Sequence, residues 1–152
     1  MNLPVISIGR KRSFPPRVTA HTERFWRSLE NGQFETSQCN DCGKKTFPPK
    51  PFCPHCWSKD LTWAPLGRFG RLYSQTVIHA APAVFRSEAP YRVCIVDLDE
   101  GLRLATLLMA DQPPVLDARL EIVALRYLDG PLFAARPLPH SSHLVSELLP
   151  PS

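Results

Sequence analysis

The C-terminal half of the chain reads as a series of short strands. Five segments are apolar or alternate apolar with polar residues, and glycine, proline or acidic turns bound them, a pattern typical of β-strands. These are residues 67–80, 91–98, 102–109, 119–128 and 132–136. Asp99-Glu100-Gly101 and Asp129-Gly130 predict two tight hairpin turns between them. Five closely joined strands over about 70 residues predict a small closed antiparallel barrel, and the five-stranded OB-fold fits this size.

Upstream of these strands, the pattern predicts one short helix between Thr22 and Gly32. Thr22 can act as its N-cap, and Gly32 fits just beyond its C-terminal end. Phe25, Trp26 and Leu29 share one side of this helix. A helix of about ten residues is marginal on its own in water, so its aromatic side must be docked. We favour docking on the chain's own domain, with a partner surface as the alternative.

Composition and charge divide the 152 residues into two parts. Seventeen prolines against seven glycines limit the helix content and favour short strands joined by stiff loops. The net charge is +4, but residues 1–71 hold twelve Lys and Arg against five Asp and Glu, whereas residues 72–152 hold six against nine. This asymmetry indicates two units. The first unit could bind nucleic acid, a phosphate-bearing cofactor or an acidic protein. The alternative is a solvated basic surface without a partner.

Four of the five cysteines form a C-x2-C-x10-C-x2-C motif, made of Cys39, Cys42, Cys53 and Cys56. Each C-x2-C can present two thiolates from one tight turn, and two such turns close a four-thiolate cage on a metal ion. We predict zinc, with iron or a redox dithiol as alternatives. Four protein ligands leave no open position for water, so the predicted site is structural. His55 lies inside the second pair and is expected to be exposed.

These patterns predict a mostly β protein in five parts. They are an extended basic arm (1–18), an N-terminal helical segment (19–32), a zinc ribbon (33–66), an OB-fold domain (67–136) and a Pro-rich tail (137–152). No run approaches the roughly 20 apolar residues of a transmembrane helix, and the first residues lack the apolar core of a secretory signal. We therefore expect a cytoplasmic protein with reduced cysteines.

Several short motifs then occur in one order. They are FW-x2-L-x2-G (25–32), CxxCG, FPPK (47–50), CPHC, PY (90–91) and LDEG (98–101). In this order they resemble a family of small proteins with an N-terminal helical segment, a rubredoxin-like zinc ribbon and a C-terminal OB-fold, associated with thiolase-like and acyl-CoA-handling enzymes. The resemblance runs from about residue 25 to about residue 135, most of the chain.

The resemblance implies a partner role. Family members typically pair with a thiolase-fold protein, and their OB domain is proposed to bind or help channel the CoA thioester. The four cysteines match the family's structural zinc ligands, and Phe25 and Trp26 match its aromatic helix positions, which we take as candidate partner contacts. Pro90 and Tyr91 match the position after the long barrel loop. Trp57 departs from the pattern, because Gly is common there, and a positive φ at this position would strain a tryptophan.

The sequence offers few candidates for chemistry outside the cysteine motif. It contains no GxSxG, phosphate-binding glycine loop or HExxH motif, so we predict no catalytic residue. Cys94 lies in an apolar run and is expected to be a buried, inert thiol. His79 ends a strand and is expected to be structural. Asp97 and Asp99 are explained by the turn that they flank.

A phosphate-bearing ligand such as CoA would need basic and aromatic side chains. Arginine binds phosphate bidentately, and an aromatic ring can stack on adenine. The candidate acyl-CoA-binding residues are Arg68, Arg71, Phe85, Arg86 and Tyr91, with plain surface arginines as the alternative.

Three functions are compatible with these observations. The first is a non-catalytic subunit that supports a thiolase-type acyl-CoA enzyme. The second is a single-stranded nucleic-acid-binding module, which the basic first half suits but the net acidic barrel half does not. The third is an independent CoA-thioester hydrolase, which the missing nucleophile constellation disfavours. We therefore expect a thiolase-like partner, with acyl-CoA as a possible ligand.

Overall fold

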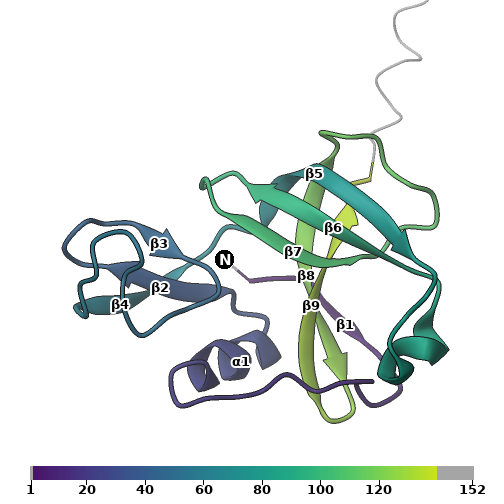
Figure 1. Cartoon of the computed structure of the whole chain (residues 1–152), viewed down its shortest axis with the longest axis horizontal. Helices are drawn as coiled ribbons and strands as arrows, with labels where there is room; N and C mark the ends of the chain where they lie inside the picture. Colours follow the sequence, from purple (N-terminus) through teal and green to yellow (C-terminus); the bar gives the residue numbers. More distant parts are fainter. Residues whose placement is uncertain (1, 140–152) are drawn as a thin grey trace, which may run out of the picture.

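Two β-sheets, one α-helix and one 3-10 helix make up the regular structure of the described residues, 2–139 (Figure 1). In this computed structural model, helix α1 (Glu23–Glu30) and a small sheet lie to one side of a larger barrel. The small sheet has the order β3-β2-β4 and consists of β2 (Glu35–Cys39), β3 (Lys45–Thr46) and β4 (Leu61–Pro65). The mostly β architecture predicted from the sequence is confirmed.

The five strands predicted for the second half form a closed barrel. They are β5 (Phe69–Ile78), β6 (Tyr91–Leu98), β7 (Arg103–Leu108), β8 (Arg119–Tyr127) and β9 (Gly130–Pro137). Their hydrogen-bonded order is β8-β5-β6-β7-β9, and β9 pairs back onto β8, which closes the ring and satisfies the strand edges. The predicted five-stranded OB-fold barrel is therefore confirmed.

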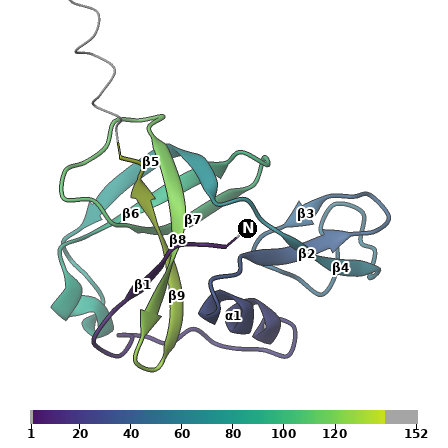
Figure 2. The same ribbon diagram turned by 180° about the vertical axis from the view of Figure 1, so that it is seen from behind.

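The N-terminal arm is part of the barrel wall rather than a free extension. Strand β1 (Val5–Ser7) pairs in parallel with β8, and Figure 2 shows it alongside β8 and β9. Arg12 then donates hydrogen bonds to the backbone oxygens of Asp129 and Pro131 at the β8–β9 turn. The prediction of a plain extended arm missed this strand, because its pairing partner lies near the other end of the sequence.

Two hydrophobic cores lie on opposite sides of β8. Alternate residues Leu120, Ile122 and Ala124 face the main core, which fills the barrel and continues to α1. The intervening Val123, Leu125 and Tyr127 belong to a second, smaller core, against which Ile6 and Ile8 of the arm pack. The arm therefore covers an apolar outer face that would otherwise contact water.

Four phenylalanine rings join the helix, the small sheet and the barrel. They are Phe25 of α1, Phe34 before β2, Phe47 after β3 and Phe133 of β9, and we call them the phenylalanine cluster. Every pair of these rings has its centroids between 5.6 and 6.3 Å apart. Most pairs meet edge to face, the geometry that the aromatic quadrupole favours. The helix is thus docked on its own chain, as favoured from the sequence.

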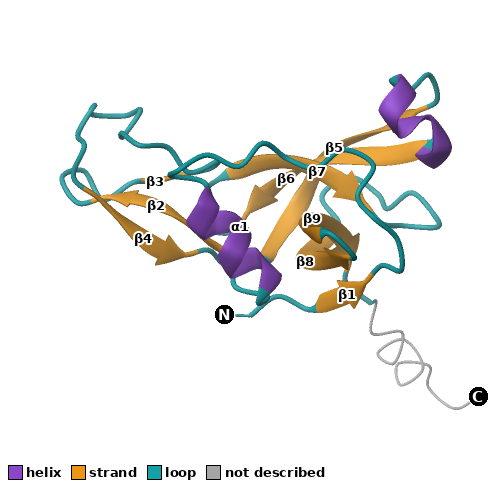
Figure 3. Ribbon diagram, turned by 90° about the horizontal axis from the view of Figure 1, so that it is seen from below, coloured by secondary structure: helices purple, strands orange, loops and turns teal. Residues whose placement is uncertain are grey.

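The connection between β5 and β6 differs from its predicted form. Residues 80–90 were expected to be a loop, but Ala83–Glu88 form the 3-10 helix η1, which projects from the barrel in Figure 3. Neither α1 nor η1, within the described residues, has the length and apolar character needed to cross a membrane. Residues 140–152 of the predicted Pro-rich tail lie outside the described residues.

Replacing Phe34 by Ala should lower the free energy of unfolding by about 3–5 kcal/mol, because it removes a fully buried ring from the joint between three elements. Urea unfolding followed by far-UV circular dichroism measures this change. Phe14→Ala is the matched control, because the Phe14 ring is 61% exposed, and it should cost less than about 1 kcal/mol. Equal losses in the two variants would contradict a central role for the cluster.

Candidate functional site

The four motif cysteines converge at the end of the small sheet. Cys39 ends β2 and Cys42 follows it, while Cys53 and Cys56 lie in the connection between β3 and β4. The four Sγ atoms all lie within 4.8 Å of one another, with Cys39–Cys56 at 3.5 Å and Cys42–Cys53 at 3.6 Å. Four sulfurs at about 2.3 Å from one tetrahedral ion would be about 3.8 Å apart. The donor set therefore fits a four-thiolate metal site.

The two C-x2-C turns repeat the same backbone hydrogen bonds. The N–H of Cys39 donates to the oxygen of Lys44, and the N–H of Gly43 donates back to the oxygen of Cys39, both at 2.9 Å. In the second turn, the N–H of Cys53 donates to Ser58 and that of Trp57 to Cys53, both at 2.8 Å. Each turn therefore holds its two sulfurs on the same side of its backbone, which explains why the C-x2-C spacing occurs in both turns.

Trp57 occupies the position that Gly43 fills in the first turn. Its φ is 64°, against 76° for Gly43, so this tryptophan does adopt the left-handed conformation that normally favours glycine. The strain of about 1–2 kcal/mol is comparable to what an aromatic pair can contribute. Trp57 makes such a pair, because its ring stacks on Phe52 at 5.4 Å between centroids. The stacking explains how the turn tolerates the departure noted in the sequence.

Backbone N–H groups prepare the sulfurs to bind a cation. The N–H of Cys42 donates to Sγ of Cys39 at 3.4 Å, and this hydrogen bond is the main reason that the pKa of the Cys39 thiol falls to about 7. The N–H of His55 likewise donates to Sγ of Cys53 at 3.4 Å. The His55 residue is exposed, as expected from the sequence. The site thus consists of four cysteine sulfurs, and those of Cys39 and Cys53 accept backbone hydrogen bonds.

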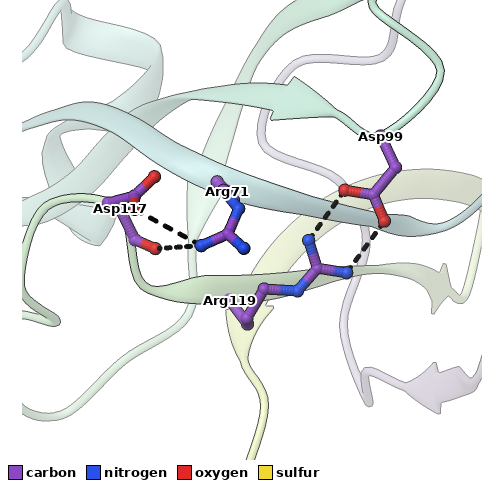
Figure 4. A network of polar contacts seen from close by, with 4 residues as sticks. All are labelled: Arg71, Asp99, Asp117 and Arg119. Atoms are coloured by element: carbon purple, nitrogen blue, oxygen red, sulfur yellow. Dashed lines mark hydrogen bonds and ion pairs between the residues drawn. The ribbon is translucent and has the colours of Figure 1, made fainter.

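The other candidates for chemistry are placed where they have structural partners. Cys94 is buried in β6, and desolvation raises the pKa of its thiol to about 11, which leaves it protonated and unreactive. Side-chain hydrogen bonds from Arg103 and Arg119 lower the pKa values of Asp97 and Asp99, respectively. The Asp99–Arg119 pair is bidentate, at 2.7 and 2.8 Å (Figure 4).

Two of the five residues expected to bind acyl-CoA are already engaged at the start of β5. Arg68 donates a hydrogen bond to the backbone oxygen of Asn2 and lies over the Phe69 ring. Arg71 forms an ion pair with Asp117 at 3.3 Å (Figure 4). Because these arginines bind groups of their own chain, they are less available to a phosphate than the sequence suggested.

The other three residues of that set gather at the opposite end of β5. Phe85 of η1 lies 6.1 Å from Tyr91 of β6 between ring centroids, and Phe14 of the arm lies 6.3 Å from Phe85. Arg86 of η1 is exposed and forms no ion pair among the described residues. Tyr91 pairs with Ile78, whereas Asp97 pairs with Arg71, so seven residue steps along β5, about 23 Å, separate the two groups.

The two candidate partner contacts on α1 differ in exposure. Phe25 is only 3% exposed and belongs to the phenylalanine cluster, whereas Trp26 is half-buried at its edge, 5.0 Å from Phe25 between ring centroids. Of the two, Trp26 alone has surface to offer a partner in this conformation.

Removing the metal or replacing Cys39 by Ser should unfold residues 33–63, because a ribbon of this size lacks enough core of its own and depends on the roughly 10–16 kcal/mol of a structural site. Two-dimensional NMR and metal analysis by mass spectrometry measure the outcome. Cys94→Ala, at a cysteine outside the cluster, should retain the metal. Native signal dispersion for residues 33–63 in a metal-free sample would refute this dependence.

Comparison with known proteins agrees with this geometry. Residues 26–62 match the rubredoxin-like zinc ribbon domain of ChsH2, and residues 63–125 match its C-terminal OB-fold domain. A solved structure of an Ltp2-ChsH2(DUF35) aldolase contains a chain with 28% sequence identity and a TM-score of 0.71, and the match covers 81% of this chain and 98% of that one.

Curated relatives include subunits and scaffold proteins. A DUF35 domain-containing scaffold protein of Methanothermobacter thermautotrophicus is 32% identical over 69% of this chain and 80% of its own length. The benzoylsuccinyl-CoA thiolase subunit BbsA of Thauera aromatica is 36% identical over 44% of this chain and 45% of its own length. Matches to further relatives span 36% to 55% of those proteins. By its zinc-ribbon and OB-fold domains and by this relationship, the chain belongs to the ChsH2 (DUF35) family.

Proposed function

We propose that this chain is a non-catalytic accessory subunit of a thiolase- or aldolase-type acyl-CoA enzyme. The observation that carries the proposal is the match to 98% of a chain in the Ltp2-ChsH2(DUF35) aldolase, because it covers 81% of this chain. The relationship to BbsA, a thiolase subunit, supports the same role. The four-thiolate site supports it in another way, because it has no open position at which a metal could activate water.

Zinc is the proposed occupant of the four-cysteine site. Thiolates are soft ligands, and four of them in tetrahedral arrangement suit zinc or iron. The zinc-ribbon family assignment favours zinc. Its role would be to tie the two C-x2-C turns together, and the ribbon would then present a fixed surface beside the barrel.

The η1 end of the barrel is the proposed contact for the CoA thioester. Phe85 and Tyr91 offer aromatic rings at this end, and the exposed Arg86, which follows Phe85 in η1, forms no ion pair among residues 2–139. The opposite group is a weaker candidate, because Arg68 and Arg71 are held by their own chain. Engaged arginines on the barrel likewise do not favour the nucleic-acid alternative, since phosphate binding there would have to break existing ion pairs.

Mixing this protein with the thiolase-like enzyme from the same source should give a hetero-oligomer whose acyl-CoA activity needs both chains. Size-exclusion chromatography with light scattering measures assembly, and a coupled thioester assay measures activity. The metal-depleted chain is the control and should assemble poorly, because its ribbon is unfolded. Separate elution of the two native chains, or thioester turnover by this chain alone, would contradict the proposal.

Arg86→Ala should weaken acyl-CoA binding to the assembled complex by about 5- to 10-fold, because it removes a charged hydrogen-bond donor to phosphate. Isothermal titration calorimetry measures the dissociation constant. Arg71→Ala is the matched control and should leave it nearly unchanged, since Arg71 is paired with Asp117 at the other end of β5. An unchanged constant for Arg86→Ala would remove the η1 end from the binding site.

A further inference from the structure

A recess of about 400 Å³ opens on the outer face of the barrel, at the edge of the second core. It is formed where the arm and η1 approach β6, β7 and β8. Its lining consists of Arg10, Ser87, Glu88, Tyr91, Leu107 and Tyr127. The volume is at the lower end of the range for small-molecule sites, and the walls combine apolar surface with a few polar groups, as such sites do.

Tyr127 is the feature that marks the recess as a binding site. Its side chain is buried, with only 8% of the residue exposed, yet its hydroxyl has no hydrogen-bond partner within residues 2–139. Tyr127 lines the recess, and its hydroxyl keeps some contact with solvent. A ligand oxygen in the recess could replace water as the hydrogen-bond partner of this hydroxyl. Burial raises the pKa of Tyr127, which keeps the hydroxyl protonated and able to donate.

The charges at the rim of the recess balance each other. Arg10 forms an ion pair with Glu88 at 2.5 Å, and its guanidinium lies 5.4 Å from the centre of the Tyr127 ring. Because the charge of Arg10 is already paired with Glu88, an anionic ligand would gain little electrostatic attraction at the rim. Glu88 and the hydroxyl of Ser87 can still accept a hydrogen bond from a ligand.

The remaining walls suit an apolar ring. Leu107 contributes an aliphatic side chain, and Tyr91 and Tyr127 contribute aromatic surface. A second hollow of about 310 Å³ shares Tyr91 and Leu107 with the recess, which leaves room for a substituent on the ring.

We propose that this recess binds a compact, uncharged ring compound that carries a hydroxyl group. The ring packs on Leu107 and Tyr91, and its hydroxyl accepts a hydrogen bond from Tyr127 and donates one to Glu88. The recess shares Tyr91 with the proposed CoA contact, but its ligand carries no phosphate. It can therefore be tested with free small molecules in the absence of both CoA and a partner enzyme.

Titration of the full chain with 4-methylphenol, followed by ¹H–¹⁵N NMR, tests the proposal. Saturable shifts are expected at the amides of Ser87, Leu107 and Tyr127. Toluene, which lacks the hydroxyl, and 4-methylbenzoate, which is an anion, should bind at least about 5-fold more weakly, since each loses the matched hydrogen bonds. Equal affinities for 4-methylphenol and toluene, or no saturable shift at these amides, would overturn it.

Two variants and a control locate the binding. Tyr127→Phe should weaken the affinity for 4-methylphenol by about 5- to 10-fold and leave that for toluene unchanged. Tyr73→Phe, at an exposed tyrosine outside the recess, should change neither affinity. Ser87→Trp, at an exposed position of η1, should fill the mouth of the recess and abolish binding, and it carries the test if Tyr127→Phe fails to fold. Unchanged affinity in these two recess variants would refute the site.

Discussion

The packing of four phenylalanine rings holds the three parts of this protein in one arrangement. The four rings come from α1 (Phe25), the residue before β2 (Phe34), the residue after β3 (Phe47) and β9 of the barrel (Phe133), and each ring lies against the other three. A helix of eight residues and strands of two to five residues bury little apolar surface separately. Because all of them share this cluster, the ribbon is positioned by the same core that fills the barrel.

The four-cysteine site stabilises a different part of the ribbon from the phenylalanine cluster. Its four sulfurs and the two repeated backbone turns fix the far end of the ribbon, where β2, β3 and β4 are too short to do so. The phenylalanine cluster fixes the near end. A ribbon held at both ends can present its surface to another protein with little loss of conformational entropy, which suits the subunit role proposed for this chain.

Charge pairing divides the barrel surface into an occupied end and an open end. Near the start of β5, arginines and aspartates pair with each other and stabilise the strand ends. At the other end, by contrast, η1 carries the exposed Arg86, and its residues Ser87 and Glu88 line the Tyr127 recess together with Tyr91. The arm contributes to this second environment, because it pairs with β8 through β1 and its Arg10 forms an ion pair with Glu88. Part of the positive charge of the N-terminal segment is therefore paired within the fold, because Arg10 and Arg12 form ion pairs with Glu88 and Asp129.

The sequence by itself determined the elements whose signals are local. The C-x2-C spacing predicted that the four cysteines converge, and alternating strands with Gly turns predicted the barrel, because ligand spacing and strand periodicity are properties of neighbouring residues. Only the tertiary structure decided which side chains meet across the chain. In the folded chain β1 pairs with β8, and Phe25 is buried. Arg68 and Arg71 bind groups of their own chain. Arg10, Glu88 and Tyr127 line one recess. Those contacts depend on pairing between distant segments, which no local pattern encodes, although the alternation of Ile6 and Ile8 was a signal that the arm had an apolar face to cover.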